Sequence, residues 1–131
     1  MTINPIRVAI NGYGNLGRGV EKAVLAAPDM ELVAIFTRRD PQQLDTVSGK
    51  AVSIKDMPDY KDKVDVCVNC GGSATDLMEQ GPAVTAYFNT VDSFDTHAKI
   101  PEHYADMDKV AHDHGHVAVI SSGWDPGLFS I

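Results

Sequence analysis

The feature that most constrains this chain is a glycine pattern, Gly12-Tyr13-Gly14-Asn15-Leu16-Gly17, with the spacing G-x-G-x-x-G. It follows a β-branched run at residues 6–10 and opens a segment, residues 16–27, whose apolar residues have helical spacing. In a strand–turn–helix unit, the first glycine permits a tight turn, the second lets the backbone approach a pyrophosphate, and the third lets the helix pack closely on the strand. The helix N-terminus offers free N–H groups to the phosphates. The pattern therefore predicts a dinucleotide site.

Strands and helices are expected to alternate along the rest of the chain. Because no hairpin signals separate the strands, we expect parallel pairing with right-handed crossovers, and the continuous apolar strands fit a sheet covered on both faces. The predicted fold class is α/β, a doubly wound Rossmann-type parallel sheet. Strands are expected at residues 6–10, 31–36, 64–69, 89–92 and 117–121, with a short one at 51–54 in the otherwise irregular stretch 41–63. Helices are expected at residues 16–27, at 74–88 with an interruption or restart at Gly81-Pro82, and at 101–114 with Gly115 just past the end.

Size, composition and charge limit the classes of protein that remain. A length of 131 residues suits one domain, and a 44% hydrophobic content allows a buried core. The formal net charge is −7 and no cluster of lysines and arginines stands out, so no nucleic-acid partner is expected. The sequence has neither a signal segment at its start nor an apolar run of membrane length, which predicts a cytoplasmic protein without a membrane partner.

The two cysteines, Cys67 and Cys70, have the C-x-x-C spacing of thiol redox sites. That chemistry needs a helix N-terminus or a cation to lower a thiol pKa, whereas this pair lies in a predicted strand. Three strand steps separate the Cα atoms by roughly 10 Å, too far for a disulfide. We interpret both as buried apolar thiols.

Two arginines follow the second predicted strand, in the order Thr37-Arg38-Arg39. A site for NAD carries an acidic residue here for the ribose hydroxyls. Guanidinium groups beside a hydroxyl instead suit a 2′-phosphate, because arginine forms bidentate, charge-assisted hydrogen bonds. The alternative is a solvated basic turn in which Asp40 pairs with an arginine. We predict NADP as the cofactor.

Three later strand ends also carry unusual residues. The sequence Cys70-Gly71-Gly72-Ser73 would let a cofactor lie close to the backbone, although Ser73 or Thr75 could at the same time cap the next helix. The other two ends carry carboxylates, Asp92 and Asp95 after one strand and Asp125 after the next, and Trp124 precedes Asp125. Carboxylates and an indole beside a nicotinamide suit a substrate with an ammonium group. Asp92 and Asp125 could equally be turn or cap residues.

Five motifs resemble the meso-diaminopimelate D-dehydrogenase family in sequence and order. They span nearly the whole chain, and the last two are more specific than the glycine pattern. The motifs are V-A-I-N-G-Y-G-N-L-G-R at residues 8–18, T-R-R at 37–39, G-S-A-T-D at 72–76, V-D-S-F-D-T-H at 91–97 and S-G-W-D-P-G at 122–127.

The resemblance implies the roles of individual residues. Asp95 and Asp125 would contact the D-centre of the substrate near its amino group, beside Trp124. The run Cys70-Gly71-Gly72-Ser73 departs from the expected C-M-G-S of the family by lacking its methionine, and a small shift in loop shape follows. Taken with the glycine pattern, the expected cofactor residues are Gly12, Tyr13, Gly14, Asn15, Leu16, Gly17, Thr37, Arg38, Arg39, Cys70, Gly71, Gly72, Ser73, Ser93, Phe94, Asp95, Ser122, Gly123, Trp124, Asp125 and Pro126.

The resemblance also implies an activity and an extent. The reaction is the reversible, NADP-dependent oxidative deamination of meso-2,6-diaminopimelate at its D-centre, giving L-2-amino-6-oxopimelate and ammonia in lysine biosynthesis. Residues 1–127 would form the dinucleotide-binding domain, and residues 128–131 would begin a substrate and dimerisation domain. We therefore expect a homodimer when the protein is full length and an inactive fragment when this part stands alone.

Two alternatives remain open at this point. One is another Rossmann dehydrogenase: the opening resembles glyceraldehyde-3-phosphate dehydrogenase, but the S-C-T-T-N-C motif of that enzyme is absent. Dihydrodipicolinate reductase and homoserine dehydrogenase share the nucleotide fold but lack W-D-P-G. The other alternative is a non-catalytic NADP(H) sensor, which has no need of Trp124 beside the carboxylates. His112, His114 and His116 straddle a predicted helix end, where histidine is favourable by itself, so no metal site is expected.

Overall fold

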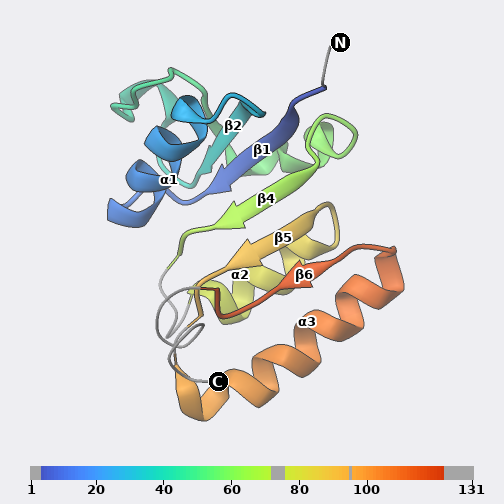
Figure 1. Cartoon of the computed structure of the whole chain (residues 1–131). Helices are drawn as coiled ribbons and strands as arrows, with labels where there is room; N and C mark the ends of the chain where they lie inside the picture. Colours follow the sequence, from blue (N-terminus) through green and yellow to red (C-terminus); the bar gives the residue numbers. More distant parts are fainter. Residues whose placement is uncertain (1–3, 72–75, 95, 123–131) are drawn as a thin grey trace.

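The computed structural model describes residues 4–71, 76–94 and 96–122. The strands of this part form a six-stranded parallel sheet with the order β3-β2-β1-β4-β5-β6 (Figure 1). The strands are β1 (Ile6–Asn11), β2 (Met30–Thr37), β3 (Ala51–Ser53), β4 (Val66–Asn69), β5 (Asn89–Asp92) and β6 (Ala118–Val119). The predicted doubly wound Rossmann-type fold is confirmed.

The strand order reverses between β1 and β4. From β1 the chain builds outward through β2 to β3, and it then returns to the other side of β1 and builds outward through β4, β5 and β6. In open α/β sheets, ligands bind outside the carboxyl ends of the strands at such a reversal. The topology therefore directs attention to the edge of the sheet where β1 and β4 end.

Three α-helices and three 3₁₀ helices connect the described strands. Helix α1 lies against β1 and β2, while α2 and α3 pack side by side next to β5 and β6 (Figure 1). Of the described helices, none is long and apolar enough to cross a membrane. The helices are α1 (Asn15–Ala26), α2 (Asp76–Thr85) and α3 (Ile100–His114), with 3₁₀ turns η1 (Pro41–Gln43), η2 (Ile54–Tyr60) and η3 (His97–Lys99).

Alternate residues of the central strands feed two cores, one on each face of the sheet. Val8 and Ile10 of β1 pack with Val24 of α1, whereas Ala9 between them faces the other core with Val84 of α2. This is the period-two alternation of a strand covered on both faces. The second core includes Phe36 and Phe88, both fully buried, and each such side chain contributes about 1.5–3 kcal/mol to stability.

Helix α2 corrects one expectation, because it runs unbroken through Gly81-Pro82, where an interruption was predicted. Proline inside a helix removes one backbone hydrogen bond and strains the preceding turn. Tertiary packing overrides this cost: a Cβ at Gly81 would lie 3.0 Å from the sulfur of Met107, so the glycine lets α2 and α3 approach closely. The Thr85 hydroxyl also donates to the Gly81 carbonyl at 2.8 Å.

The last strand is shorter than predicted, and α3 ends where expected. Strand β6 has only two residues, against a predicted 117–121. Beyond it, Ser121 adopts a left-handed conformation with φ 57°, and its amide turns to the side chain of Asp92 rather than to a strand partner. At the end of α3, Gly115 is left-handed with φ 67°, which is the glycine end predicted from the sequence.

Candidate functional site

The carboxyl ends of the central strands form one aligned row. Asn11 of β1 pairs in register with Asn69 of β4, and Asn69 pairs with Asp92 of β5. All three side chains are buried. On the other side of β1, Phe36 of β2 pairs with Asn11. The four segments that follow these four residues are the ones predicted to bind the cofactor. The fold therefore brings four segments that are far apart in the sequence to one edge of the sheet.

The glycine loop has the geometry that the motif predicted. Gly12 adopts φ 94°, a conformation that L side chains rarely take, and its amide donates to the Phe36 carbonyl at 3.1 Å. A side chain at Gly17 would clash with the backbone of Gly12, so close packing of α1 on the turn depends on this glycine. Gly14 instead has open space where a side chain would stand, and no side chain caps the start of α1. The loop therefore leaves room and free N–H groups for an anion.

A buried carboxylate that the sequence analysis did not predict, Glu21, connects the glycine loop at Tyr13 to the segment at residues 47–48. Glu21 of α1 is fully buried and accepts hydrogen bonds from the Tyr13 hydroxyl at 2.5 Å and from the Ser48 amide at 2.9 Å. It also accepts from the Ser48 hydroxyl and the Val47 amide. Burial opposes its ionisation, but the bonds from Ser48 and Tyr13 outweigh it and lower the pKa of Glu21. Burial, together with the bond to Glu21, raises the pKa of Tyr13.

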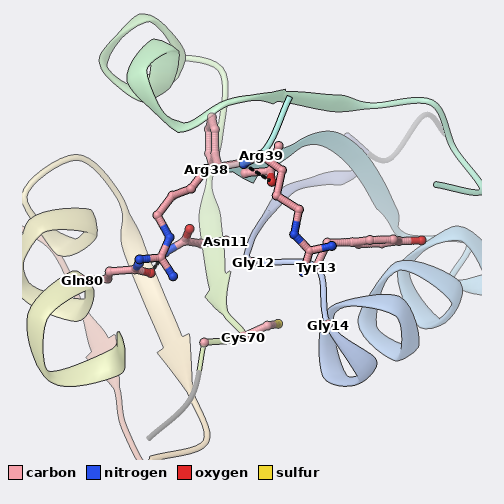
Figure 2. Close-up of a pocket in the computed structure, with 11 residues that line it drawn as sticks. Asn11, Gly12, Tyr13, Gly14, Arg38, Arg39, Cys70 and Gln80 are labelled. Carbon is pink, nitrogen blue, oxygen red and sulfur yellow. Dashed lines mark hydrogen bonds between the residues drawn. The ribbon is translucent and has the colours of Figure 1, made fainter. Parts of the chain in front are cut away.

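A cavity of about 280 Å³ opens between the ends of β1, β2 and β4. In Figure 2 the side chain of Arg38 extends toward Asn11 and Gln80, while that of Arg39 extends toward Tyr13. Both arginines are exposed. The cavity is lined by Asn11, Gly12, Tyr13, Gly14, Phe36, Thr37, Arg38, Arg39, Cys70, Gly71 and Gln80.

Hydrogen bonds from backbone amides to nearby side chains hold the arginine segment in place. The buried hydroxyl of Thr37 accepts the Arg39 amide at 3.0 Å, which fixes the turn just beyond β2. Asp40, which the sequence left as a possible partner of an arginine, accepts the Gln42 amide at 3.0 Å and starts η1. Arg38 and Arg39, at the end of β2, thus border the cavity. One hydrogen bond holds the start of their turn and another holds the segment that follows it.

Amide side chains and a thiol form the β4 side of the cavity. Asn11 donates from its side-chain nitrogen to Gln80 at 3.1 Å and to Asn69 at 3.4 Å. Both cysteines are free, with Cys67 buried and Cys70 partly buried. Burial raises the pKa of Cys70 to about 12 and that of Cys67 further, so both stay protonated near neutral pH. The interpretation of Cys67 as a buried thiol is confirmed, and Cys70 lines the cavity.

At the β5 end, Asp92 has the turn role that the sequence left open. Its side chain accepts backbone amides from the segments after β5 and after β6. The side chain of Phe94 is fully buried and stacks on the His103 ring with centroids 4.3 Å apart. A cofactor contact by Phe94 would therefore come from its backbone, whereas Ser93 is half-buried and Ser122 is exposed.

Part of the predicted site lies outside the described residues. These residues are Gly72, Ser73, Asp95, Gly123, Trp124, Asp125 and Pro126. In the described part, no group of three or more histidine, cysteine, aspartate or glutamate side chains could hold a metal ion. His114 and His116 each bond a backbone carbonyl, of Val110 and Thr85 respectively.

Comparisons with known proteins agree with the motifs. No protein-family model matches the chain. A curated meso-diaminopimelate D-dehydrogenase from Ureibacillus thermosphaericus is 57% identical over 130 residues, which cover 98% of this chain and 40% of that protein. A solved structure of an engineered D-amino acid dehydrogenase bound to NADP+ superposes with a TM-score of 0.92 at 49% identity, over 98% of this chain and 39% of that one. The Corynebacterium glutamicum DAP dehydrogenase in complex with DAP gives a TM-score of 0.91 at 49% identity, with the same coverage.

The resemblance to meso-diaminopimelate D-dehydrogenases is confirmed. The chain spans about two fifths of the length of the curated relatives that it matches. The match extends over nearly all of the chain, including the segments that contain the two most specific motifs.

The alternative dehydrogenases are less similar. A glyceraldehyde-3-phosphate dehydrogenase from Metallosphaera sedula is 57% identical, but over only 30 residues, or 23% of this chain. The homoserine dehydrogenase of S. aureus superposes with a TM-score of 0.64 at 15% identity. That likeness shows a common fold and nothing more.

Proposed function

We propose that this chain is the NADP(H)-binding part of a meso-diaminopimelate dehydrogenase. The observation that supports this most strongly is the match to curated meso-diaminopimelate D-dehydrogenases, at 49–58% identity in four of them, across nearly the whole chain. The proposed reaction of the whole protein is the reversible oxidative deamination of meso-2,6-diaminopimelate at its D-centre, within lysine biosynthesis. We expect the whole protein to be a cytoplasmic homodimer and this part alone to be inactive.

The described residues fit NADP(H). The positive φ of Gly12 and the open space at Gly14 leave a cradle where a side chain would otherwise stand, and the start of α1 can bind the pyrophosphate there. Arg38 and Arg39 border the same cavity, and guanidinium groups suit a 2′-phosphate better than a 2′-hydroxyl. The relative with a TM-score of 0.92 is itself described as bound to NADP+.

The substrate end of the site is proposed from the sequence. A bound NADP+ would supply the hydride acceptor for the D-configured carbon, and water would complete the conversion of that centre to a keto group with release of ammonia. Asp95 and Asp125 would hold the amino group of the substrate and later help to activate water, while Trp124 would supply an apolar wall. The protein's main contribution is to align the carbon–hydrogen bond with the ring.

The direct test is the initial rate of NADPH formation by the whole protein with meso-diaminopimelate. We expect turnover with NADP+ and the meso compound, and none with L,L-diaminopimelate or simple D-amino acids. Absence of turnover together with tight NADPH binding would contradict the enzyme and favour a nucleotide sensor.

Variants of the two proposed carboxylates test their role toward the substrate. Asp95→Asn and Asp125→Asn in the whole protein should abolish turnover and keep the affinity for NADPH. If either variant kept the wild-type rate, that carboxylate would have no part in the reaction.

A further inference from the structure

A buried Asp–His pair lies beneath the β5–β6 end of the candidate site. The Nε2 atom of His103 is 2.7 Å from an Oδ2 oxygen of Asp92, and both side chains are fully buried. Burying a carboxylate is costly unless hydrogen bonds replace its water. Because this buried pair lies directly under the edge where the cofactor is expected to bind, core packing alone does not explain it.

Asp92 uses its remaining acceptors on two separate segments of backbone. Its Oδ1 atom accepts the Phe94 amide at 2.9 Å and the Ser121 amide at 3.0 Å. Its main-chain carbonyl accepts the Ser122 amide at 2.9 Å. One residue thus joins the segment after β5 to the segment after β6.

The segment after β6 depends on this bond. Ser121 is the one described residue other than glycine with a positive φ, 57°. That conformation is unfavourable for an L residue and persists only where neighbouring groups enforce it. The carboxylate of Asp92 is the group that accepts the Ser121 amide in this geometry.

His103 fixes the direction of the Asp92 carboxylate. It comes from the first turn of α3, and its ring stacks on Phe94 at a centroid distance of 4.3 Å. Its Nδ1 atom has no hydrogen-bond partner in the described part of the chain, so Nε2 is the ring nitrogen that donates to Asp92. Gly81 makes room for this ring: a Cβ there would lie 3.3 Å from its Cε1 atom.

We infer that Asp92 and His103 are positioning residues, which hold the ends of β5 and β6 in the geometry that the nicotinamide half of the cofactor requires. The glycine loop and the arginines lie at the ends of β1 and β2, on the other side of β4, where the pyrophosphate and the 2′-phosphate of the adenosine half would bind. A dinucleotide spans the reversal in strand order, so the pair affects one half of the cofactor and not the other. The inference rests on the function proposed above.

The test compares two probes, NADPH and 2′,5′-ADP, which keeps the 2′-phosphate but lacks the nicotinamide half. His103→Phe keeps a stacking ring and removes the N–H donor, whereas His103→Gln keeps a donor and removes the ring. In the whole protein we expect His103→Phe to weaken NADPH binding about tenfold and to leave 2′,5′-ADP binding unchanged. His103→Gln should restore most of the NADPH affinity.

A matched control distinguishes positioning from stability. The Thr85 hydroxyl is buried and bonds the Thr90 hydroxyl at 2.8 Å under the same strand, but it reaches neither segment that Asp92 joins. Thr85→Val should lower the melting temperature without changing the ratio of the two affinities. Should His103→Phe fail to fold, Asp92→Asn provides the same comparison with a smaller expected loss of NADPH affinity.

The outcomes are distinct. Equal weakening of both probes by His103→Phe and Asp92→Asn, or a lower melting temperature with unchanged NADPH affinity, would overturn the positioning role alone. A wild-type protein that bound neither probe would overturn the proposed function and this inference with it.

Discussion

The two halves of the carboxyl edge differ in how they are built. The β1–β2 half depends on backbone shape and exposed cations: a turn at Gly12, an open position at Gly14 and a pair of arginines. The β5–β6 half depends on a buried carboxylate, Asp92, that accepts amides from two segments. The first half is encoded in short runs of neighbouring residues, whereas the second needs residues far apart in the chain.

The halves nevertheless share one device. Glu21 in the first half and Asp92 in the second are both buried carboxylates that accept backbone amides from a loop. Each also accepts from a ring-bearing residue, the Tyr13 hydroxyl in one case and the His103 ring in the other. When a buried carboxylate accepts hydrogen bonds from a loop, a movement of the loop removes a donor and leaves the carboxylate without a full set of partners. This is costly, so the carboxylate fixes the geometry of the loop.

The largest effect is expected at the glycine loop, from Gly17→Ala. The added methyl group would clash with the backbone of Gly12, which cannot move without opening the turn. We expect a loss of about 1–3 kcal/mol in the free energy of unfolding, the usual cost of overpacking, together with loss of NADPH binding. Chemical denaturation and a NADPH titration measure the two effects.

Gly19→Ala on the same helix is the control, because nothing lies within 4 Å of a Cβ there. It should stabilise the protein by about 0.4–1 kcal/mol. Equal destabilisation by both variants would show that the motif glycine has no special packing role.

The second effect tests the exposed cations of the same half. Replacing both Arg38 and Arg39 by glutamine should weaken NADPH binding about 10- to 100-fold, since their charge-assisted bonds to the phosphate together contribute roughly 1.5–3 kcal/mol. NADH binding should change little, because its ribose carries a hydroxyl. Lys61→Gln, an exposed cation away from the cavity, should change neither affinity. Equal weakening of NADPH and NADH would argue against a 2′-phosphate site.

The third effect concerns the buried carboxylate of the first half. Glu21→Gln should cost about 1–2 kcal/mol at pH 7, the worth of bonds to a charged group. Because the pKa of Glu21 is lowered in the folded protein, its contribution is complete above the ordinary value of 4.5 and disappears as the pH falls through the lowered pKa. The difference between variant and wild type should therefore shrink in acid. A pH-independent difference would contradict a role for the charge; the exposed Glu102→Gln serves as control.

The smallest effect is expected for an ion pair at the opposite edge. Arg7 and Asp65 form a 2.9 Å pair with side chains 42% and 45% exposed. The hydrogen bond from Arg7 lowers the pKa of Asp65, but solvent screens such pairs. Asp65→Asn should cost only about 0.2–1 kcal/mol in thermal or chemical unfolding. A loss as large as that of Glu21→Gln would mean that burial is not what distinguishes the carboxylates of the site.

The sequence predicted the parts of this molecule that depend on local chemistry. The carboxyl ends of β1 to β5 to within one residue, the turn at Gly12 and the end of α3 at Gly115 follow from glycine spacing and apolar periodicity, and the structure has them, whereas β6 ends two residues before its predicted end. The arginine segment was located in the same way, from its place after β2. Such features need no knowledge of distant neighbours.

The parts that were missed depend on partners far away in the sequence. Glu21 lies in a helix where a charged residue would ordinarily face solvent, and its partner Ser48 comes from a stretch predicted as irregular. The pairing of His103 with Asp92 was not predicted, since nothing in the sequence near either residue relates the two. Continuity of α2 through Pro82 likewise required the packing of α2 against α3.

The measurement that tests the central claim most directly is a pair of calorimetric titrations of this chain, one with NADPH and one with NADH. We predict that NADPH binds at least about tenfold more tightly, because Arg38 and Arg39 meet a 2′-phosphate in one case and a hydroxyl in the other. Equal affinities, or tighter binding of NADH, would contradict the assignment of this edge as an NADP(H) site.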